Sequence, residues 1–507
     1  MRTKSALVNS MSGLVYQIVN MLIGFIVPRY IITIYGSEIN GLTSNIQQYI
    51  NILHLLQAGL IAASGCEMYK PIVLGDNETV GRIYYSDRKY FRRMSYVFLV
   101  LAITVIPSML IGKAENISQR ELIISILILA FNGYLAFKYC CCYDLMFSVH
   151  QKKYILYAAL TIERAVYYTI LAICLIFRPN YNLMYIGYLL GTIAKLLFLR
   201  YQFKRMYEKS IIQYKGQTGY KIRNQYYVLG EQIVFRIMDS VPILIVTKIY
   251  SLSYASIYSI YIMVIAAFKS VFDIIQNALT PSFGDLYAMH EKEKEYVADV
   301  FDMIQSIYFF ILNVVSICLG ILFLSFVNIY VGKGQPLNYV CNEIALFISL
   351  QMIMYIFFSQ YNMITNAAGL YKQFFKGNIA IGLGGILISI ICAKINFQLV
   401  YVGITIYYLS AMFQRYLLIR RKIIPLNVKC IARPITTMLI YLICFNFFSD
   451  TMFSVIGMKI TSWIMNAVWI AMMGVMISFL LSFLIDRRQL MKTYEMFKGI
   501  MGKRGKR

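Results

Sequence analysis

Charged residues are scarce in this chain. Asp, Glu, Lys and Arg make up 14% of its 507 residues, whereas 59% are hydrophobic. Soluble globular domains are about one quarter charged, so this composition excludes an ordinary soluble protein. The formal net charge of +25 is therefore better explained by membrane topology than by nucleic-acid binding, and we expect no nucleic-acid partner.

Residues that build metal and catalytic sites are also scarce or badly spaced. There are only three histidines, and no Cys/His spacing suits a zinc site. Three of the ten cysteines, Cys140, Cys141 and Cys142, follow one another inside an apolar run, where cysteine acts as a small hydrophobic residue. Phosphate-binding glycine loops and Ser/His/Asp arrangements are missing from the sequence. We expect no catalytic residues, no metal and no cofactor, and a protein that is not an enzyme.

Long hydrophobic blocks are what the chain does contain. Each is long enough to cross about 30 Å of hydrocarbon as a helix. The sequence predicts an all-α polytopic membrane protein of about 14 transmembrane helices. The predicted spans are 11–35, 42–74, 94–112, 121–147, 155–177, 182–203, 225–250, 253–281, 300–328, 341–368, 377–394, 398–419, 430–449 and 460–485.

The basic residues orient these spans. With the N-terminus inside, the inner loops and termini carry 35 Lys and Arg residues and the outer loops carry 7. Cytoplasmic loops are enriched in Lys and Arg, so this bias predicts that both termini are cytoplasmic. After Asp486, Leu490, Tyr494, Phe497 and Met501 repeat at helical spacing. This basic segment, 486–507, is expected either as an amphipathic helix on the inner leaflet or as a disordered tail.

A weak internal repeat divides the chain. Gln17-Ile18-Val19 recurs as Gln232-Ile233-Val234, and Ile34-Tyr35 recurs 215 residues later as Ile249-Tyr250. This offset places span 1 on span 7 in the same orientation, as in transporters with two parallel six-helix repeats. We expect an N-terminal lobe at 1–213, a C-terminal lobe at 214–425, two extra helices at 426–485, and the basic tail at 486–507.

A stretch near the N-terminus resembles a known family. It consists of Tyr35-Gly36-Ser37-Glu38-Ile39-Asn40-Gly41-Leu42, Ser44-Asn45-Ile46, Leu56-Gln57-Ala58-Gly59-Leu60 and Met68-Tyr69-Lys70-Pro71, with the basic loop Arg82–Arg93 after it. These residues resemble the first two spans of bacterial polysaccharide transporters, the Wzx-type flippases of capsule and O-antigen repeat units. That family belongs to the multidrug/oligosaccharidyl-lipid/polysaccharide (MOP) exporter superfamily, together with lipid II flippases and multidrug and toxin extrusion antiporters.

The resemblance implies two six-helix lobes that work by alternating access in the bacterial cytoplasmic membrane. It implies a flippase for undecaprenyl-pyrophosphate-linked oligosaccharides, with membrane lipids and H⁺ or Na⁺ as further partners. The alternatives within the superfamily are a lipid II-type flippase and a cation-coupled multidrug exporter. A membrane polysaccharide polymerase or acyltransferase is disfavoured, because the longest external connection, at 329–340, is about a dozen residues.

Ionisable residues inside spans are costly and usually face a cavity or a partner. Five cations from five helices lie at similar depths, about 12 to 18 Å from the inner ends of their spans, and a further arginine follows Pro28. We expect them to bind the substrate's pyrophosphate; they are Arg29, Lys138, Arg164, Lys195, Arg236 and Lys269. Three acids could bind a coupling ion or neutralise these cations: Glu231, Asp239 and Asp273.

Structural roles compete with these assignments. Asp239 lies three residues after Arg236, and Asp273 lies four after Lys269, so each pair could neutralise itself on one helix face. Lys195 could extend its stem to the inner interface. Arg164 is harder to explain in this way, because the adjacent Glu163 points about 100° away on a helix.

Overall fold

The computed structural model describes residues 2–53, 64–65, 67–68, 71–72, 74–110, 117–177, 180–214, 216, 225–290, 292–332, 337–368, 371–453 and 460–504. Every regular element in these ranges is a helix. In lipid, a helix satisfies all its own backbone hydrogen bonds, which is why long apolar blocks fold in this way. The predicted all-α polytopic class is confirmed.

Two compact units divide the chain, residues Met1–Ser259 and Ile260–Arg507. The α-helices of the first unit are α1 (Arg2–Leu53), α3 (Asn77–Leu110), α4 (Gln119–Leu135), α5 (Cys141–Val149), α6 (Lys153–Phe177), α7 (Asn182–Phe203), α8 (Lys209–Ile211) and α9 (Gln225–Ile249). It also has two π-helices, η1 (Ala136–Cys140) and η2 (Lys204–Glu208), and a 3₁₀ turn, η3 (Ile212–Tyr214).

Helix α10 (Leu252–Met289) begins in the first unit and continues in the second. The second unit then contains α11 (Lys294–Val331), α12 (Asn342–Ala367), α13 (Tyr371–Ile395), the 3₁₀ turn η4 (Phe397–Leu399), α14 (Tyr401–Lys422), α15 (Lys429–Phe453) and α16 (Ile460–Arg504). The boundary between the units lies after the predicted lobe boundary at 213, and the division into lobes stays a prediction.

Eleven helices in the described ranges are long and apolar enough to cross a membrane. The helices α3 and α9 are also long, but charged residues such as Arg88 and Arg236 lie along them. The long helix α1 contains two helical arms that meet at Gly36, whose φ of 86° is a left-handed value that glycine adopts without strain. Counting α3 and α9 gives up to thirteen. The predicted span 42–74 includes residues 54–63, which lie outside the described ranges, so the number of fourteen stays a prediction.

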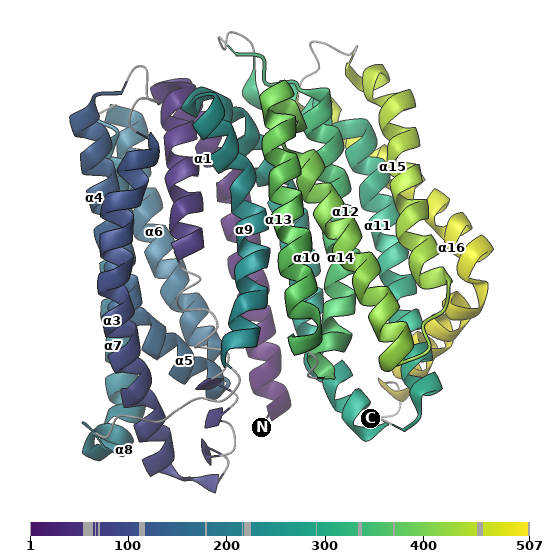
Figure 1. Cartoon of the computed structure of the whole chain (residues 1–507), viewed down its shortest axis with the longest axis horizontal. Coiled ribbons are helices and arrows are strands. Elements are labelled where there is room, and N and C mark those ends of the chain that lie inside the picture. The colour runs from purple at the N-terminus through teal and green to yellow at the C-terminus, as the bar shows by residue number, and fades with distance from the viewer. Residues whose placement is uncertain are drawn as a thin grey trace. The chain divides into compact units, whose positions relative to one another are not determined.

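Neighbouring helices of the first unit run side by side along most of their length (Figure 1). The contacts join α6 to α7, α3 to α4, α4 to α7, and α1 to both α6 and α9. Two apolar clusters form the core. One includes Leu42, Phe98 and Tyr185, and the other includes Phe91, Phe147 and Phe203.

In the second unit, α11 is the helix on which α15 and α16 both pack, while α14 contacts α12 and α13. The two helices expected as extra spans, α15 and α16, are thus part of this compact unit. Helix α16 is broken at Asp486, where φ is −127° and ψ is 29°. The basic segment beyond the break is helical up to Arg504, which agrees with the amphipathic-helix alternative; most of its side chains, from residue 493 on, lie outside the described ones.

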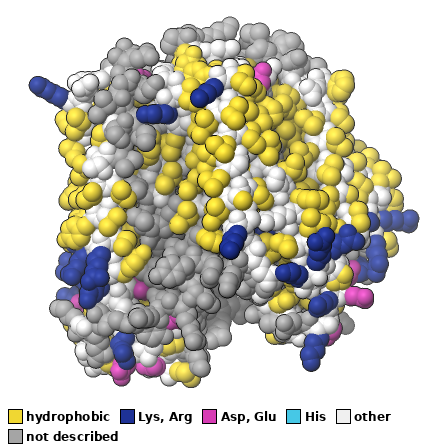
Figure 2. All heavy atoms as spheres, in the orientation of Figure 1, with side chains coloured by type: hydrophobic (Ala, Val, Ile, Leu, Met, Phe, Trp, Pro, Cys, Tyr) yellow, Lys and Arg dark blue, Asp and Glu magenta, His cyan; other side chains and the backbone are white. Residues whose placement is uncertain are grey.

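The surface is consistent with a surrounding bilayer. Hydrophobic side chains cover the middle of the helices, and Lys and Arg side chains gather mainly near one end of them (Figure 2). On α16, Met465 and Trp469 are each 62% exposed and Leu484 is 78% exposed. Apolar side chains exposed along a whole helix face are stable in lipid and costly in water.

Candidate functional site

Arg164 lies in a group of tyrosines between α6 and α7. Its Nη1 atom donates a hydrogen bond of 2.5 Å to the hydroxyl of Tyr188, and its guanidinium carbon lies 5.4 Å from the centre of that ring. The Tyr167 ring lies 4.3 Å from the Tyr188 ring and 5.2 Å from that of Tyr168. The Nε atom of Arg164 is buried and has no hydrogen-bond partner among the described residues.

The acid next to Arg164 in sequence is engaged elsewhere. Glu163 forms an ion pair of 3.2 Å with Lys195, and it also accepts a hydrogen bond of 2.9 Å from Thr192. Both of these partners are on α7. Lys195 therefore contacts an acid inside the helix pair. The different directions expected for Glu163 and Arg164 are observed, and Arg164 has tyrosine as its neighbour.

Two glycines on α7 bring the helices close enough for these contacts. A Cβ atom at Gly191 would lie 2.5 Å from the carbonyl oxygen of Glu163, and one at Gly187 would lie 3.0 Å from Ile170. Glycines spaced by four residues allow close packing of membrane helices. The approach of the backbones places Tyr188, on the turn between the two glycines, beside Arg164.

A small cavity adjoins the same tyrosines. It holds about 10 Å³ and is lined by Thr43, Gln47, Tyr185, Tyr188 and neighbouring apolar side chains. The hydroxyls of Thr43 and Tyr185 are 2.9 Å apart. This volume admits about one water molecule, so the Arg164 region offers polar groups from α1, α6 and α7 around a nearly closed space.

Lys138 faces a different part of the first unit. It lies in the π-helix η1, where its Nζ atom donates a hydrogen bond of 2.5 Å to the Tyr134 hydroxyl. Its ammonium group also lies 4.9 Å from the centre of the Tyr134 ring, 5.2 Å from that of Tyr139, and 5.7 Å from that of Tyr96 on α3. The cations expected at one level thus have separate surroundings in this unit.

The remaining predicted residues of the first unit lie on α1 and α9. Arg29 and Arg236 are exposed, and Asp239 is half-buried. Glu231 belongs to α9, but its side chain lies outside the described ones. Their assignment to substrate or ion binding stays a prediction.

In the second unit, Lys269 and Asp273 both contact Tyr355 on α12. The Lys269 Nζ atom lies 4.0 Å from the centre of the Tyr355 ring, and the Tyr355 hydroxyl donates a hydrogen bond of 2.9 Å to Asp273. The Tyr308 hydroxyl bonds Gln276 one turn further along α10, at 3.1 Å. A polar strip therefore follows α10 between α11 and α12.

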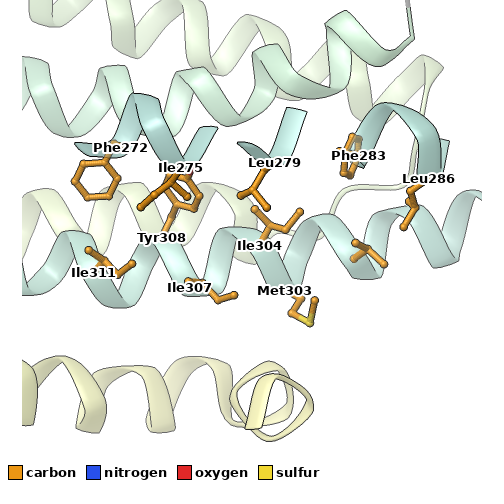
Figure 3. A pocket seen from close by; sticks show the side chains of 11 residues that line it. Phe272, Ile275, Leu279, Phe283, Leu286, Met303, Ile304, Ile307, Tyr308 and Ile311 are labelled. Carbon is orange, nitrogen blue, oxygen red and sulfur yellow. The ribbon is translucent and has the colours of Figure 1, made fainter. Parts of the chain in front are cut away.

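An apolar pocket of about 280 Å³ lies next to this strip (Figure 3). Phe272, Ile275, Leu279 and Phe283 point into it from α10, and Ile304, Ile307 and Ile311 point into it from α11. Such a lining suits a hydrocarbon chain better than a sugar or a phosphate.

The N-terminal motif forms a junction between α1 and the start of α10. The Asn40 amide donates hydrogen bonds to the hydroxyls of Ser256 at 2.8 Å and Ser259 at 2.7 Å. A Cβ atom at Gly41 would overlap the carbonyl oxygen of Leu252. Residues 41 and 256 are separated by 215 residues, which is the offset of the predicted repeat.

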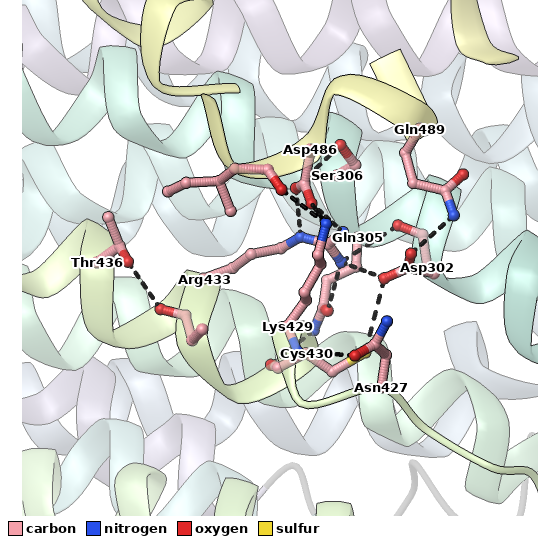
Figure 4. Close-up of polar contacts among 12 residues, drawn as sticks. Asp302, Gln305, Ser306, Asn427, Lys429, Cys430, Arg433, Thr436, Asp486 and Gln489 are labelled. Carbon is pink, nitrogen blue, oxygen red and sulfur yellow. Dashed lines mark hydrogen bonds and ion pairs between the residues drawn. The ribbon is translucent and has the colours of Figure 1, made fainter. Parts of the chain in front are cut away.

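The described residues also form a buried ionic cluster that was not predicted from the sequence, and its centre is Arg433. Arg433 on α15 is fully buried, and its guanidinium bonds Asp302 on α11 at 2.7 Å and Asp486 on α16 at 2.5 and 2.8 Å (Figure 4). Gln305 accepts a further bond at 3.0 Å, and Lys429 lies 3.6 Å from Asp486.

The same cluster extends into the segment beyond the kink of α16. Gln489 donates to Asp302 at 2.7 Å, and Lys492 forms an ion pair with Asp299. The tail helix is thus anchored to α11 through protein contacts. Arg433 is the fourth residue of the predicted span 430–449. This position within a span was the only indication in the sequence that its side chain could lie between helices.

A second arginine counted with the inner loops is also buried. Arg415 on α14 is 1% exposed, and its guanidinium lies 4.1 Å from the centre of the Phe358 ring and 5.6 Å from that of Phe374. Both arginines lie near the ends of predicted spans, where sequence alone counts them with the loops.

Comparison with known proteins agrees with this architecture. No protein-family model and no curated protein matches the sequence. Among solved structures, a lipid II flippase, MurJ, in an inward closed conformation is 14% identical, with a TM-score of 0.66 over 94% of this chain and 99% of the other. An inward-facing multidrug resistance transporter of the MATE family is 10% identical, with a TM-score of 0.62 over 83% and 99%. The chain therefore has the fold of the MOP-superfamily transporters.

Proposed function

We propose that this protein is a flippase that moves an undecaprenyl-pyrophosphate-linked oligosaccharide repeat unit across the bacterial cytoplasmic membrane by alternating access. The observation that carries the proposal is the environment of Arg164. Its guanidinium is held by Tyr188, its Nε atom is buried without a hydrogen-bond partner among the described residues, and the neighbouring acid Glu163 bonds Lys195 instead.

A half-buried cation with no ion-pair partner among the described residues is stable beside water or an anionic ligand. Pyrophosphate fits this requirement, because guanidinium binds phosphate oxygens through paired hydrogen bonds. The tyrosines around Arg164 offer rings for stacking on sugars and hydroxyls for bonding them. Arg29, Lys138, Lys195, Arg236 and Lys269 complete the proposed substrate contacts, and Glu231, Asp239 and Asp273 the proposed ion-coupling groups.

The related functions differ in the charge of the substrate. A lipid II-type flippase would use the same cations for the same pyrophosphate. A cation-coupled multidrug exporter would place its cationic substrate next to Arg164, which costs electrostatic energy. The similar structures include both a lipid II flippase and a multidrug transporter. The choice between an anionic and a cationic substrate therefore rests on the side chains around Arg164.

The experiment uses Arg164→Ala, Arg164→Lys and a matched control, Arg200→Ala, which removes an exposed cation from α7. In a flippase-deficient strain, we expect Arg164→Ala to abolish complementation at normal protein abundance. Arg164→Lys should restore part of the activity, because charge survives without the paired donors. The control should complement fully.

Two results would contradict the proposal. One is full complementation by Arg164→Ala. The other is loss of folded Arg164→Ala protein that is rescued by Glu163→Gln, since this would make Arg164 a member of a structural ion-pair network. Reconstituted vesicles then separate the functions: the lipid-linked oligosaccharide should cross without a covalent change, and transport of cationic drugs instead would favour the exporter.

A further inference from the structure

We propose that a basic pocket on the α3 side of the first unit binds the phosphate group of an anionic lipid. The pocket is formed by Arg88, Lys89 and Arg92 of α3 together with Lys138 of η1, and it holds about 540 Å³. It lies apart from the Arg164 region and shares only Lys138 with the proposed substrate contacts, so the inference does not depend on the proposed transport function.

The spacing on α3 produces the first wall of the pocket. Tyr85, Arg88, Lys89 and Arg92 follow one another at intervals of three, one and three residues, so they share one helix face. The adjacent Arg93 is exposed but does not line the pocket. The three cations of this face are exposed and form no ion pair with any described residue.

The second wall holds a cation in a fixed place. Lys138 bonds the Tyr134 hydroxyl and lies over tyrosine rings of α3 and α4. Its segment, η1, is a π-helix. Such bulges inside α-helices occur frequently at functional sites, because they turn side chains away from the regular α-helical direction. Here the bulged segment contributes both Lys138 and Tyr139 to the pocket.

The charge of the pocket favours an anion. Its lining contains four cations and one acid, Glu208. Like charges gathered in one pocket repel each other, and a bound anion relieves this repulsion. A volume of several hundred cubic ångströms is typical of small-ligand sites, and arginine presents the donor geometry that phosphate oxygens accept.

The position of the pocket indicates where the phosphate comes from. Residues 85–92 precede the predicted span 94–112, on the side where the basic loops gather, so they are expected at the level of the inner-leaflet headgroups. Basic pockets between membrane helices on the cytoplasmic side bind anionic lipid headgroups. A free phosphate ion carries the same chemistry, and the experiment separates the two sources.

The test measures lipid binding to the purified full chain in detergent. The pocket variant Arg88→Gln/Arg92→Gln is compared with Arg82→Gln/Arg93→Gln, which removes the same charge from two exposed positions of α3 that do not line the pocket. Titration with phosphatidylglycerol should give a dissociation constant about 100-fold higher for the pocket variant, about tenfold for each lost guanidinium contact. The control should stay within about threefold of wild type, and Lys138→Gln should weaken binding if the double variant fails to fold.

Two further arms identify the ligand. Competition by inorganic phosphate at millimolar concentration means that the phosphate group alone accounts for recognition, whereas failure to compete means that the bilayer lipid is the source. Equal weakening in the pocket and control variants, or equal binding of neutral phosphatidylcholine, would overturn the proposal.

Discussion

Replacing Arg433 by methionine tests how the second unit is held together. Arg433 is the fully buried centre of the cluster that joins α11, α15 and α16, with Asp302 at 2.7 Å and Asp486 at 2.5 Å. Methionine keeps a similar length and apolar stem but removes the charge. The variant leaves two buried carboxylates with Lys429 as the remaining cation of the cluster.

The expected magnitude follows from this burial. Removing one member of a buried ion pair costs about 3–5 kcal/mol, because the remaining charge is left without compensation. For a unit of roughly 250 residues, each kcal/mol lowers the melting temperature by about 2–4 °C. We therefore expect Arg433→Met to melt about 6–20 °C below wild type.

A second substitution separates charge from packing. Arg433→Met/Asp486→Asn removes one cation and one anion, so Asp302 is the one carboxylate of the arginine's two ion pairs that remains charged. We expect the double variant to recover at least half of the lost stability, which is a coupling between contacting residues. Arg421→Met, at the exposed end of α14, is the matched control and should cost at most about 1 kcal/mol.

The assay is thermal unfolding of purified protein in detergent, followed by tryptophan fluorescence or by size-exclusion chromatography after heating. The reasoning is refuted if Arg433→Met has the same melting temperature as the Arg421→Met control. It is also refuted if the double variant is less stable than Arg433→Met, because the cost would then arise from packing and not from unpaired charge.

Three other outcomes are expected. Gly41→Ala should lower the melting temperature by several degrees because its Cβ would overlap the Leu252 carbonyl, whereas Gly24→Ala, with open space around it, should not; equal effects would contradict the close approach. Burial raises the pKa of the Asp87 carboxyl to about 7, above its unfolded value near 4, so the free energy of unfolding should fall as pH rises from about 4 to 7 and stay low above that. Asp87→Asn should thus melt at a higher temperature than wild type at pH 8, and the difference in melting temperature should be smaller at pH 5. A difference that does not change with pH would contradict a raised pKa of Asp87. A single cysteine at Lys152 should resist an impermeant thiol reagent added outside intact cells; labelling there would reverse the predicted topology.

The fold class could be predicted because a membrane span requires properties of the segment itself, namely its hydrophobicity and its length. Hydrophobicity and segment length determine whether a segment can cross the membrane. Both can be read from the sequence without knowing which helices pack beside the segment. The predicted spans also end at residues 35 and 250, close to the break of α1 at Gly36 and to the end of α9 at Ile249.

The partners of the buried charges depended on the tertiary structure. Depth along a helix suggested one ring of cations, but helix rotation and packing decide which neighbour each side chain meets. Lys195 meets Glu163 across the α6–α7 contact, whereas Lys138 turns toward α3 from a π-helix. A π-helix shifts the direction of later side chains and leaves little trace in composition.

The sequence by itself thus determined a polytopic helical scaffold, because hydrophobicity acts locally along the chain. Only the tertiary structure decided which charges are ion pairs, which face tyrosines and which form pockets. Arg433 and Arg415 show the reason: near a span end, the same arginine can lie in a loop or inside a bundle. The difference is made by residues more than a hundred positions away, such as Asp302, that only folding brings within bonding distance.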